Sequence, residues 1–401
     1  MCPTDLDYPC QETAAGMIDQ RSPTMARPSL SLEGLLIELR SLALSGLPRM
    51  FDDETGLFIF RLDRREDTVV PAGLSRRYTA MVLLGLCGEA PDVATTLLRG
   101  ETIADTATRL IDTAGSHDSL GDLALIAWAA RAAGCSAEPV WRRIKEMQPD
   151  LLPYPTVELA WVVSAVAADP QLAGSDFGRG LAARLRGAFQ RDTGIFPHEC
   201  GGKATGIRSH VSCFADFVYP AMALAQFGAA TGDRDSITIA GEAARTMCRL
   251  QGADGQWWWH FDLRTGRVVE RYPVYAVHQD AMAPMALFAV AQAANLNFDD
   301  AIARGLRWLQ SAPELNGGSL IDSDTGLIWR KIARREPAKL NRYVQAGASY
   351  LSPNLRAPGM NAVFPPISVD FEDRPYHLGW ILYAWPSYRA AAWPHAVHEG
   401  R

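Results

Sequence analysis

The chain has 401 residues, of which 48% are hydrophobic and 21% charged, and its formal net charge is −6. This length allows a large hydrophobic core. The mild negative charge, without any basic run, argues against a nucleic-acid partner or an anionic membrane surface. No apolar stretch approaches the roughly 18–20 residues that a membrane span needs, so we expect no integral membrane segment.

The N-terminal segment, residues 1–28, is polar and lacks the charged start and apolar centre of a signal peptide. We interpret it as a disordered leader, followed by a single domain over residues 29–401. The seven cysteines are scattered and show no CxxC spacing. This pattern favours reduced thiols and therefore a cytoplasmic location.

Helical periodicity appears twelve times along the chain, and two kinds of helix alternate. The first kind is amphipathic, with charges on one face, and comprises residues 30–44, 90–111, 138–147, 176–189, 235–251 and 299–310. The second kind is apolar nearly all round and comprises residues 77–86, 120–133, 157–168, 217–229, 282–294 and 376–392. A helix that is apolar on every side must be buried on every side, whereas an amphipathic helix faces solvent. We therefore predict an all-α (α/α)6 toroid with six inner and six outer helices; an open solenoid is the alternative.

The loops that enter inner helices one, four, five and six are about twenty to more than sixty residues long, far above the usual median of about 4–6. Gly-centred turns between β-prone residues predict small hairpins at residues 54–58, 192–196 and 324–329. Since all these loops precede inner helices, they should rise over one rim of the ring. Long structured loops on a rigid scaffold usually carry function.

Several polar residues stand at the expected starts of inner helices. Ser119 followed by Asp122 is typical of a capping box at the second inner helix. Asp216 and Asp280 each stand four residues before a proline, and proline fits the first helical turn. Both carboxylates should therefore lie at the mouth of the ring, as an acid–base pair or as ligands of a polar substrate. The alternative is that each only caps its helix.

The residues beside Asp280 add groups that can move protons or form hydrogen bonds. His278 is a candidate catalytic residue, and Tyr275 and Gln279 are candidates for substrate binding. A purely structural role for His278 is the alternative.

A cluster of carboxylates, Asp370-Phe371-Glu372-Asp373, precedes the sixth inner helix. Clustered carboxylates repel one another, which raises the pKa of one and makes Glu372 a candidate protonated acid. The neighbouring residues Asp373, Tyr376 and His377 are candidates for substrate binding. A helix cap with solvated charges is the alternative.

Aromatic residues crowd the loops and the rim. Tyr78, Trp161, Trp257 and Trp258 are candidates for substrate binding, because aromatic faces stack on sugars and stabilise carbocations. Core packing explains any one of them equally well.

A metal site has little support in the sequence. His210, a further candidate for substrate binding, lies three residues before Cys213, but no repeated ligand spacing completes a set. The sequence also lacks a phosphate-binding glycine loop and a nucleophile elbow. We therefore expect no metal and no cofactor.

The segment from Gln251 to Trp257 has the QxxxGxW spacing, with a looser echo at residues 305–318. It resembles the glycine–tryptophan repeats of squalene-type terpenoid cyclases and protein prenyltransferase β subunits, which are α/α toroids. The cluster at residues 370–373 is similar to the DxDD acid motif of proton-initiated cyclases, with Glu372 in the donor position. The chain has room for one toroid, where such cyclases normally use two, and the prenyltransferase zinc triad is not recognisable.

The resemblance implies a terpenoid-cyclase-like enzyme, a lyase or isomerase, that protonates an isoprenoid and shields the carbocation in the toroid cavity. The alternative is a carbohydrate-active enzyme, a glycoside hydrolase, lyase or sugar epimerase, in which His278 and the Asp216/Asp280 pair act as acid and base. A third possibility is a non-catalytic binding toroid. An apolar cavity would favour an isoprenoid, and a polar cleft edged with tryptophan would favour a sugar. The sequence does not specify an oligomeric state.

Overall fold

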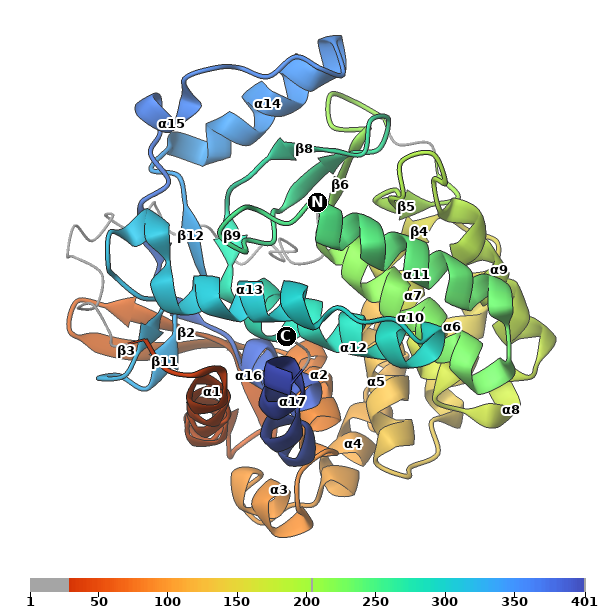
Figure 1. Cartoon of the computed structure of the whole chain (residues 1–401). Helices are drawn as coiled ribbons and strands as arrows, with labels where there is room; N and C mark the ends of the chain where they lie inside the picture. Colours follow the sequence, from red (N-terminus) through yellow and green to blue (C-terminus); the bar gives the residue numbers. More distant parts are fainter. Residues whose placement is uncertain (1–28, 203–204, 400–401) are drawn as a thin grey trace.

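Six buried helices form a closed ring in the computed structural model, which describes residues 29–202 and 205–399 (Figure 1). These inner helices are α2 (Arg76–Leu86), α5 (Leu120–Ala132), α7 (Thr156–Ala167), α10 (Ala215–Thr231), α12 (Ala283–Ala294) and α16 (Pro375–Ala384). Each packs against the next in chain order, and α16 packs against α2. The ring is therefore closed, as the predicted (α/α)6 toroid requires and an open solenoid does not allow. The predicted leader lies outside the described residues, and its boundary with a single domain stays a prediction.

The outer helices are amphipathic and cover the ring. They are α1 (Leu32–Gly46), α4 (Ile103–Asp112), α6 (Glu138–Glu146), α9 (Asp176–Ala188), α11 (Arg234–Arg249) and α13 (Asp299–Ser311). In α6 only Val140, Trp141 and Ile144 are buried, whereas α7 is buried from Thr156 to Val166. This contrast confirms that the alternation in the sequence separates outer from inner helices.

The ring closes through a direct contact between two helix backbones. A Cβ atom on Gly85 of α2 would lie 2.2 Å from the carbonyl oxygen of Gly379 of α16. A Cβ on Gly379 would lie 2.8 Å from the Cα of Val82. Only residues without a side chain allow this approach, so the two glycines set how closely the first and last inner helices pack.

Two predicted helices are each divided in the structure. Arg99 and Gly100 have positive φ angles of 57° and 100°, and they end α3 (Pro91–Leu97) before Thr102 and Asp105 form the capping box of α4. The second break falls at Pro386, which lacks the N–H that would continue α16. The chain resumes there as α17 (Ser387–Glu399), which packs against α1.

The fifth inner helix begins with a π-helical turn, η3 (His278–Met282). Pro284 cannot donate a hydrogen bond to the carbonyl of Asp280, four residues before it. The indole Nε1 of Trp385 donates to this carbonyl instead, over 2.6 Å. This hydrogen bond ties η3 to the end of α16.

The three predicted hairpins are present, and each has a glycine with positive φ at its turn. Gly56 (φ 65°) lies between β1 (Phe51–Asp52) and β2 (Leu57–Arg65), and Gly326 (φ 69°) lies between β10 (Ile321–Asp322) and β11 (Leu327–Ile328). Gly194 (φ 75°) stands inside an antiparallel bridge between Gln190 and Ile195. Glycine adopts this backbone conformation without steric cost, which is why these turns were recognisable.

The remaining strands form four small antiparallel sheets beside the inner helices. In the first sheet, β2 pairs with β3 (Thr68–Leu74) and β14 (Glu372–Asp373); in the second, β4 (Tyr154–Pro155) pairs with β5 (Glu199–Cys200). In the third sheet, β7 (His260–Asp262) lies between β6 (Val211–Cys213) and β8 (Arg267–Glu270). In the fourth, β12 (Lys331–Ala333) lies between β9 (Val274–Tyr275) and β13 (Ser368–Asp370). The short helices are α8 (Pro170–Ala173), α15 (Met360–Val363), η1 (Leu47–Arg49), η2 (Ala114–Ser116), η4 (Pro313–Leu315) and η5 (Pro337–Lys339). A further helix that the sequence analysis did not predict, α14 (Leu340–Leu351), packs on β8 and stands with α15 at the top of Figure 1.

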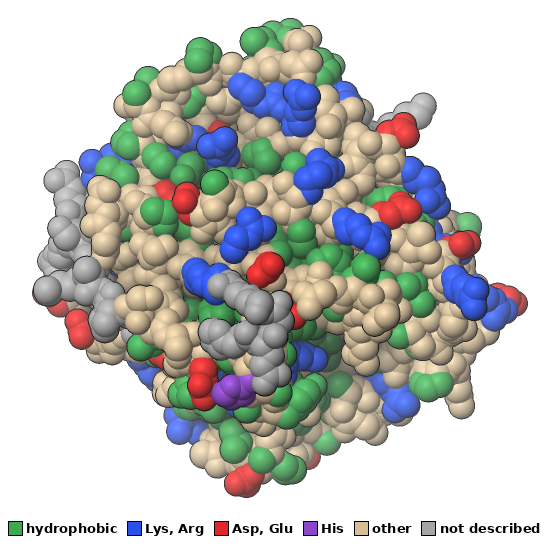
Figure 2. All heavy atoms as spheres, viewed as in Figure 1, with side chains coloured by type: hydrophobic (Ala, Val, Ile, Leu, Met, Phe, Trp, Pro, Cys, Tyr) green, Lys and Arg blue, Asp and Glu red, His purple; other side chains and the backbone are tan. Residues whose placement is uncertain are grey.

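In the part of the chain that the structure describes, basic side chains form no single continuous patch on the face of the molecule that Figure 2 shows. On the face drawn in Figure 2, Lys and Arg side chains stand in separate groups among apolar and acidic ones. Among the described residues, no helix combines the length and the apolar character needed to cross a bilayer. The five cysteines in the described ranges are unlinked to one another.

Candidate active site

The N-terminal ends of the inner helices, here called the mouth, bring charged and aromatic side chains together. The rings of Tyr78 and Tyr376 have centroids 4.7 Å apart, and those of Trp161 and Tyr219 are 5.1 Å apart. Arg374 donates to the Tyr78 hydroxyl over 3.0 Å. Four inner helices, α2, α7, α10 and α16, thus contribute to one aromatic surface.

Two carboxylates from consecutive inner helices meet one arginine at the mouth. Arg77 donates from Nε to Oδ1 of Asp122 over 2.5 Å, and its Nη2 lies 3.8 Å from Oε1 of Glu158. Its guanidinium carbon also lies 5.4 Å from the centre of the Trp161 ring. The side chains of Asp122 and Glu158 are 14% and 8% exposed, so both can be reached from solvent although they are largely enclosed.

The surroundings shift the two carboxyl pKa values in opposite directions. Burial raises the pKa of Asp122, but the contact with His117 and the charge and hydrogen bond of Arg77 outweigh it and hold the pKa below its usual value. Burial also raises the pKa of Glu158, and here Arg77 and the Gly121 N–H do not offset burial and the Asp122 charge. One carboxyl therefore stays ionised while the other keeps its proton to higher pH, which is how acid–base pairs are distinguished in enzymes.

Local sequence places both carboxylates in the first turn of a buried helix. The Ser119 hydroxyl accepts from the Asp122 N–H over 3.3 Å, and this cap fixes the start of α5. The N–H of Gly121 donates to Oε2 of Glu158 over 3.2 Å, and a Cβ on Gly121 would lie 3.0 Å from the Glu158 Cγ. In the sequence, Asp122 is recognisable as part of a cap, and Glu158 was not among the predicted site residues. The signal that could have identified both is a carboxylate near the start of two consecutive, otherwise apolar helices.

A second charged cluster lies between β13, β14 and β12. Arg374 donates to Oε2 of Glu372 over 2.7 and 2.9 Å, and Arg330 lies 3.2 Å from the same oxygen. Burial raises the pKa of Glu372, but these guanidinium groups lower it further than burial raises it. The Nζ of Lys331 lies 2.7 Å from Oδ2 of Asp370. Burial raises the pKa of Asp370, but the charges of Lys331 and Arg330 outweigh burial and hold this pKa at about 2. Glu372 is therefore an ionised partner of arginines at neutral pH, not a protonated acid.

A buried His–Asp pair lies where η3 meets α16. Both carboxylate oxygens of Asp280 are 2.9 Å from Nε2 of His377. Burial lowers the pKa of His377, but Asp280 raises it more, so the net shift is upward; burial raises the pKa of Asp280 itself. Burial also raises the pKa of the nearby Asp373 to about 6. These residues, predicted to bind or act on substrate, form an enclosed group whose charges influence one another.

Other residues singled out from the sequence lie in the wall of the ring. His278 is fully buried against Phe214, Trp259 and Tyr275, with ring centroids 4.4, 5.2 and 4.9 Å away. Burial lowers its pKa to about 3, so the ring is neutral.

The other predicted substrate-binding residues in this part of the chain form packing contacts and hydrogen bonds within the protein. Gln279 accepts from the N–H of Trp257 and donates to the carbonyl of Tyr275. Trp258 packs edge-on against Tyr272. His210 lies 2.7 Å from the Ser349 hydroxyl, at α14. Their roles in substrate binding stay predictions.

Asp216 and Asp280 have separate partners. Asp216 is fully buried and contacts His198, Ser212 and the N–H of Cys213, whereas Asp280 contacts His377. The acid–base role predicted for the Asp216/Asp280 pair therefore has no direct contact to support it among the described residues.

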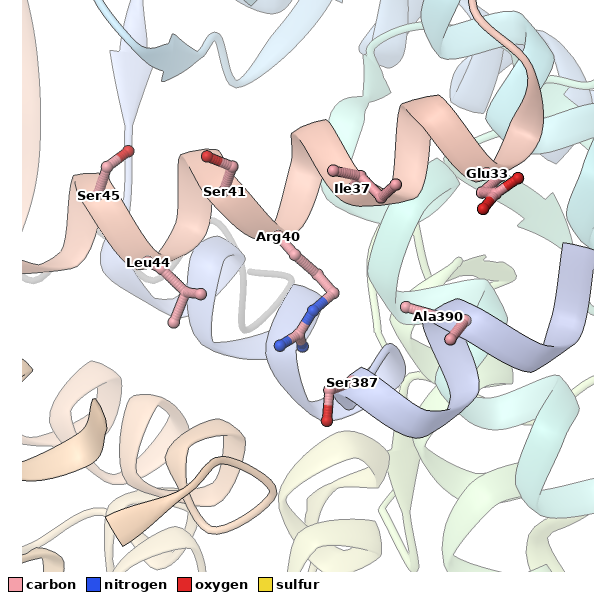
Figure 3. Close-up of a pocket in the computed structure, with 9 residues that line it drawn as sticks. Glu33, Ile37, Arg40, Ser41, Leu44, Ser45, Ser387 and Ala390 are labelled. Carbon is pink, nitrogen blue, oxygen red and sulfur yellow. The ribbon is translucent and has the colours of Figure 1, made fainter. Parts of the chain in front are cut away.

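A pocket of about 590 Å³ lies on the outer side of the molecule, between α1 and α17 (Figure 3). Arg40 extends from α1 across it, and donates to Glu89 and to the carbonyl of Trp385. Its remaining lining is Ser, Ala, Leu and Ile with one exposed glutamate, Glu33. Because this lining holds no acid–base pair, the mouth remains the better candidate.

Neither a protein-family model nor a curated protein matches this sequence. Solved structures do share its fold. An unsaturated glucuronyl hydrolase specific for heparin has a TM-score of 0.56 at 12% identity, over 90% of this chain and 97% of that one. The unsaturated glucuronyl hydrolase of Bacillus sp. GL1, responsible for glycosaminoglycan degradation, has a TM-score of 0.52 at 12% identity, over 88% and 95% of the two chains. A sugar epimerase from a ruminal bacterium has a TM-score of 0.54 at 11% identity, over 89% and 98%.

These comparisons contradict the terpenoid-cyclase interpretation, including its prenyltransferase-like and isoprenoid parts, since the similar structures are named as enzymes of sugars. The QxxxGxW spacing has a structural explanation. Gln251 donates from Nε2 to the carbonyls of Gly255 and Ala301, both over 2.9 Å, and so ties the end of α11 to α13. The motif therefore stabilises the contact between two outer helices, α11 and α13, in this ring. At these identities the comparisons establish one thing about the chain, which is that it has the (α/α)6 toroid fold of these enzymes.

Proposed function

We propose that this protein is a carbohydrate-active enzyme, and specifically a glycoside hydrolase that acts at the mouth. The observation that carries the proposal is the pair Asp122 and Glu158, whose pKa values are shifted apart around Arg77. Most glycoside hydrolases use two carboxyl groups of unequal pKa, one as the general acid and the other as the base or nucleophile. The fold shared with glucuronyl hydrolases supports the same reading.

Each carboxyl has a distinct role in this proposal. Glu158, with the raised pKa, donates its proton to the oxygen of the leaving group as the glycosidic bond breaks. Asp122, which stays ionised, accepts a proton from the water that attacks the anomeric carbon. Arg77 lies closer to Asp122 than to Glu158 and helps to lower the pKa of Asp122, whereas burial keeps that of Glu158 raised. The rings of Trp161 and Tyr78, which are 2% and 8% exposed, form part of the wall beside the pair.

The chemistry of the mouth favours a sugar over an apolar substrate. Charged groups of Arg77, Asp122, Glu158 and Arg374 lie beside the aromatic rings there. Carbohydrate binding uses hydrogen-bonding groups together with aromatic faces, whereas a hydrocarbon could form no hydrogen bond with these charged groups.

The test is a hydrolysis screen of saturated oligosaccharides and unsaturated uronides with the full chain, followed by variants on the best substrate. Glu158→Gln and Asp122→Asn should each lower kcat by roughly 10²–10⁴-fold, the usual contribution of a general acid or base. The matched control is Asp118→Asn, because Asp118 lies just before α5, four residues from Asp122, with its side chain 97% exposed. Turnover at the wild-type rate in both carboxyl variants would remove the pair from the mechanism.

A second candidate, a sugar epimerase, is favoured by the His377–Asp280 pair. A histidine held by a carboxylate can take a proton from a carbon next to a carbonyl group. This reaction would produce a stereoisomer and incorporate deuterium from D2O, whereas hydrolysis produces two sugars. Loss of activity in His377→Asn together with full activity in Glu158→Gln would favour the epimerase.

A further inference from the structure

Three residues that can bind a metal lie close together at the N-terminal end of α10. His198 precedes β5, Cys213 ends β6, and Asp216 lies in the first turn of α10. One ligand atom from each residue lies within 4.8 Å of the other two, and Nδ1 of His198 is 3.0 Å from Oδ2 of Asp216. In a tetrahedral zinc site, ligand atoms lie about 3.3–3.8 Å apart, given metal–ligand bonds of about 2.0–2.3 Å. The three groups are thus close to the spacing of a metal site.

The carboxylate of Asp216 has one oxygen without a hydrogen bond. Oδ2 accepts from the N–H of Cys213 over 2.8 Å and from the Ser212 hydroxyl over 3.2 Å, and it is also the oxygen that lies 3.0 Å from Nδ1 of His198. Oδ1 is buried and accepts no hydrogen bond from any described residue. Asp216 itself is 0% exposed. Leaving a carboxylate oxygen unsatisfied in such a site is costly, and a bound cation would satisfy it.

We propose that His198, Cys213 and Asp216 bind a zinc ion. Imidazole nitrogen, thiolate sulfur and carboxylate oxygen are the three ligand types that zinc takes in proteins. The side chain of His198 is 29% exposed, whereas Cys213 and Asp216 are buried. The ion would therefore be held from the protein side by two buried ligands, with room on the solvent side for a water molecule as the fourth ligand.

Hydrogen bonds around Asp216 support this assignment. A metal-binding carboxylate is normally oriented by hydrogen bonds to its other oxygen. Ser212 and the backbone of Cys213 provide these bonds to Oδ2, while Oδ1 has no hydrogen bond from a described residue. The zinc site uses neither Asp122 nor Glu158, so the result of the zinc titration and the result of the hydrolysis assay can be told apart.

The test uses the untagged full chain, stripped with a chelator and then titrated with zinc chloride. Metal analysis after gel filtration should give one zinc per chain, and the melting temperature should rise with zinc concentration by mass action. Cobalt(II) in place of zinc should give a thiolate-to-metal charge-transfer absorption. Substoichiometric zinc and an unchanged melting temperature in the wild-type protein would overturn the proposal.

Variants assign the ligands. Cys213→Ser, His198→Gln and Asp216→Asn should each weaken zinc binding by at least about 100-fold, the upper end of the effect of losing an outer hydrogen bond to a metal ligand. Cys213→Ser should also abolish the cobalt–thiolate band. Cys135→Ser is the matched control, because Cys135 is a partly buried thiol whose sulfur lies 3.7 Å from the Ala104 carbonyl at α4.

Circular dichroism distinguishes a lost ligand from a lost fold, because a folded variant with wild-type zinc affinity would exclude its residue as a ligand. Cys200 lies near the site, with its sulfur 3.2 Å from the Thr156 hydroxyl. A cobalt band that survives Cys213→Ser and disappears in Cys200→Ser would overturn the ligand set proposed here.

Discussion

The backbone N–H of Gly121 donates to the carboxylate of Glu158 across 3.2 Å, from the start of one inner helix to the start of the next. The absence of a side chain on Gly121 is what allows this approach, because a Cβ there would lie 2.9 Å from Trp161 and 3.0 Å from Glu158. The position of the proposed acid therefore depends on a residue that has no chemistry of its own.

Replacing this glycine tests the positioning of the acid. Gly121→Ala should lower kcat by about 10²-fold, because a displacement of about 1 Å from productive geometry can cost that much. KM should change less than kcat, since substrate contacts elsewhere remain. Gly180→Ala is the control: Gly180 is an exposed position of α9 where an added Cβ meets no atom within 4 Å. Equal kcat in Gly121→Ala and Gly180→Ala would show that Glu158 does not need this placement.

The opposite pKa shifts of the carboxyl pair predict a bell-shaped dependence of kcat/KM on pH. Activity requires ionised Asp122, whose lowered pKa sets the acidic limb, and protonated Glu158, whose raised pKa sets the alkaline limb. Arg77→Gln removes a positive charge that lowers both pKa values, so both limbs should move to higher pH. Steady-state kinetics over a pH series measures this, and limbs that stay in place would mean that other groups are titrating.

The His377–Asp280 pair predicts a dependence of thermal stability on pH. The pKa of His377 is raised above its usual 6.5, so its contribution to stability is complete below that value and is lost as pH rises through the folded-state pKa. The raised pKa of Asp373, about 6, acts in the same direction at lower pH. The melting temperature should therefore fall as the solution is taken from about pH 6 to about pH 8.

Asp280→Asn should reverse the part of this pH dependence of the melting temperature that comes from His377. Without the carboxylate, burial is the main influence on His377 and holds its pKa below the unfolded value. The contribution of the histidine is then complete above the unfolded pKa and is lost as pH falls. Differential scanning calorimetry of the two proteins over the same pH series makes the comparison. A melting temperature that declines equally in both would show that His377 is not the titrating group.

The contact between Gly85 and Gly379 predicts where the ring is most sensitive to added volume. In Gly85→Ala the new methyl group would meet a backbone carbonyl, which cannot rotate away as a side chain can. We expect a loss of about 1–3 kcal/mol in the free energy of unfolding, as for other overpacked core sites. Gly180→Ala should instead gain about 0.5–1 kcal/mol from helix propensity. Urea denaturation measures both changes. Equal free energies of unfolding in the Gly85→Ala and Gly180→Ala variants would mean that α2 and α16 can separate to admit the methyl group without loss of stability.

The fold could be predicted because burial acts on the composition of whole helices. An inner helix such as α7 has no solvent-facing side, and its sequence shows this without reference to any other segment. The turns at Gly56 and Gly326 were recognisable for a similar reason, since their backbone conformation selects glycine locally. The breaks at Gly100 and Pro386 carried local signals of the same kind, and the helical periodicity on either side concealed them.

The candidate site could be predicted only in part, because it depends on contacts between helices. The lowered pKa of Asp122 depends on His117 and on Arg77, which comes from a third helix, and the raised pKa of Glu158 depends on its burial and on the Asp122 charge. The possible zinc ligands show the same limit: His210 stands nearer to Cys213 in sequence, but β6 directs it toward Ser349, and His198 meets Asp216 instead. Sequence spacing could not distinguish the two histidines.

The closure of the ring between α2 and α16 also has a consequence during synthesis on the ribosome. The two helices are far apart in the sequence although they are in contact in the fold. During synthesis α2 therefore leaves the ribosome long before α16, which covers the last exposed apolar side of α2. Until α16 has been translated, the nascent chain presents a hydrophobic edge of the kind that attracts chaperones and promotes aggregation. Premature termination before residue 375 should therefore yield an aggregating fragment instead of a smaller stable ring, and the yield of active protein should depend on chaperone supply more than is usual for a helical domain with local contacts.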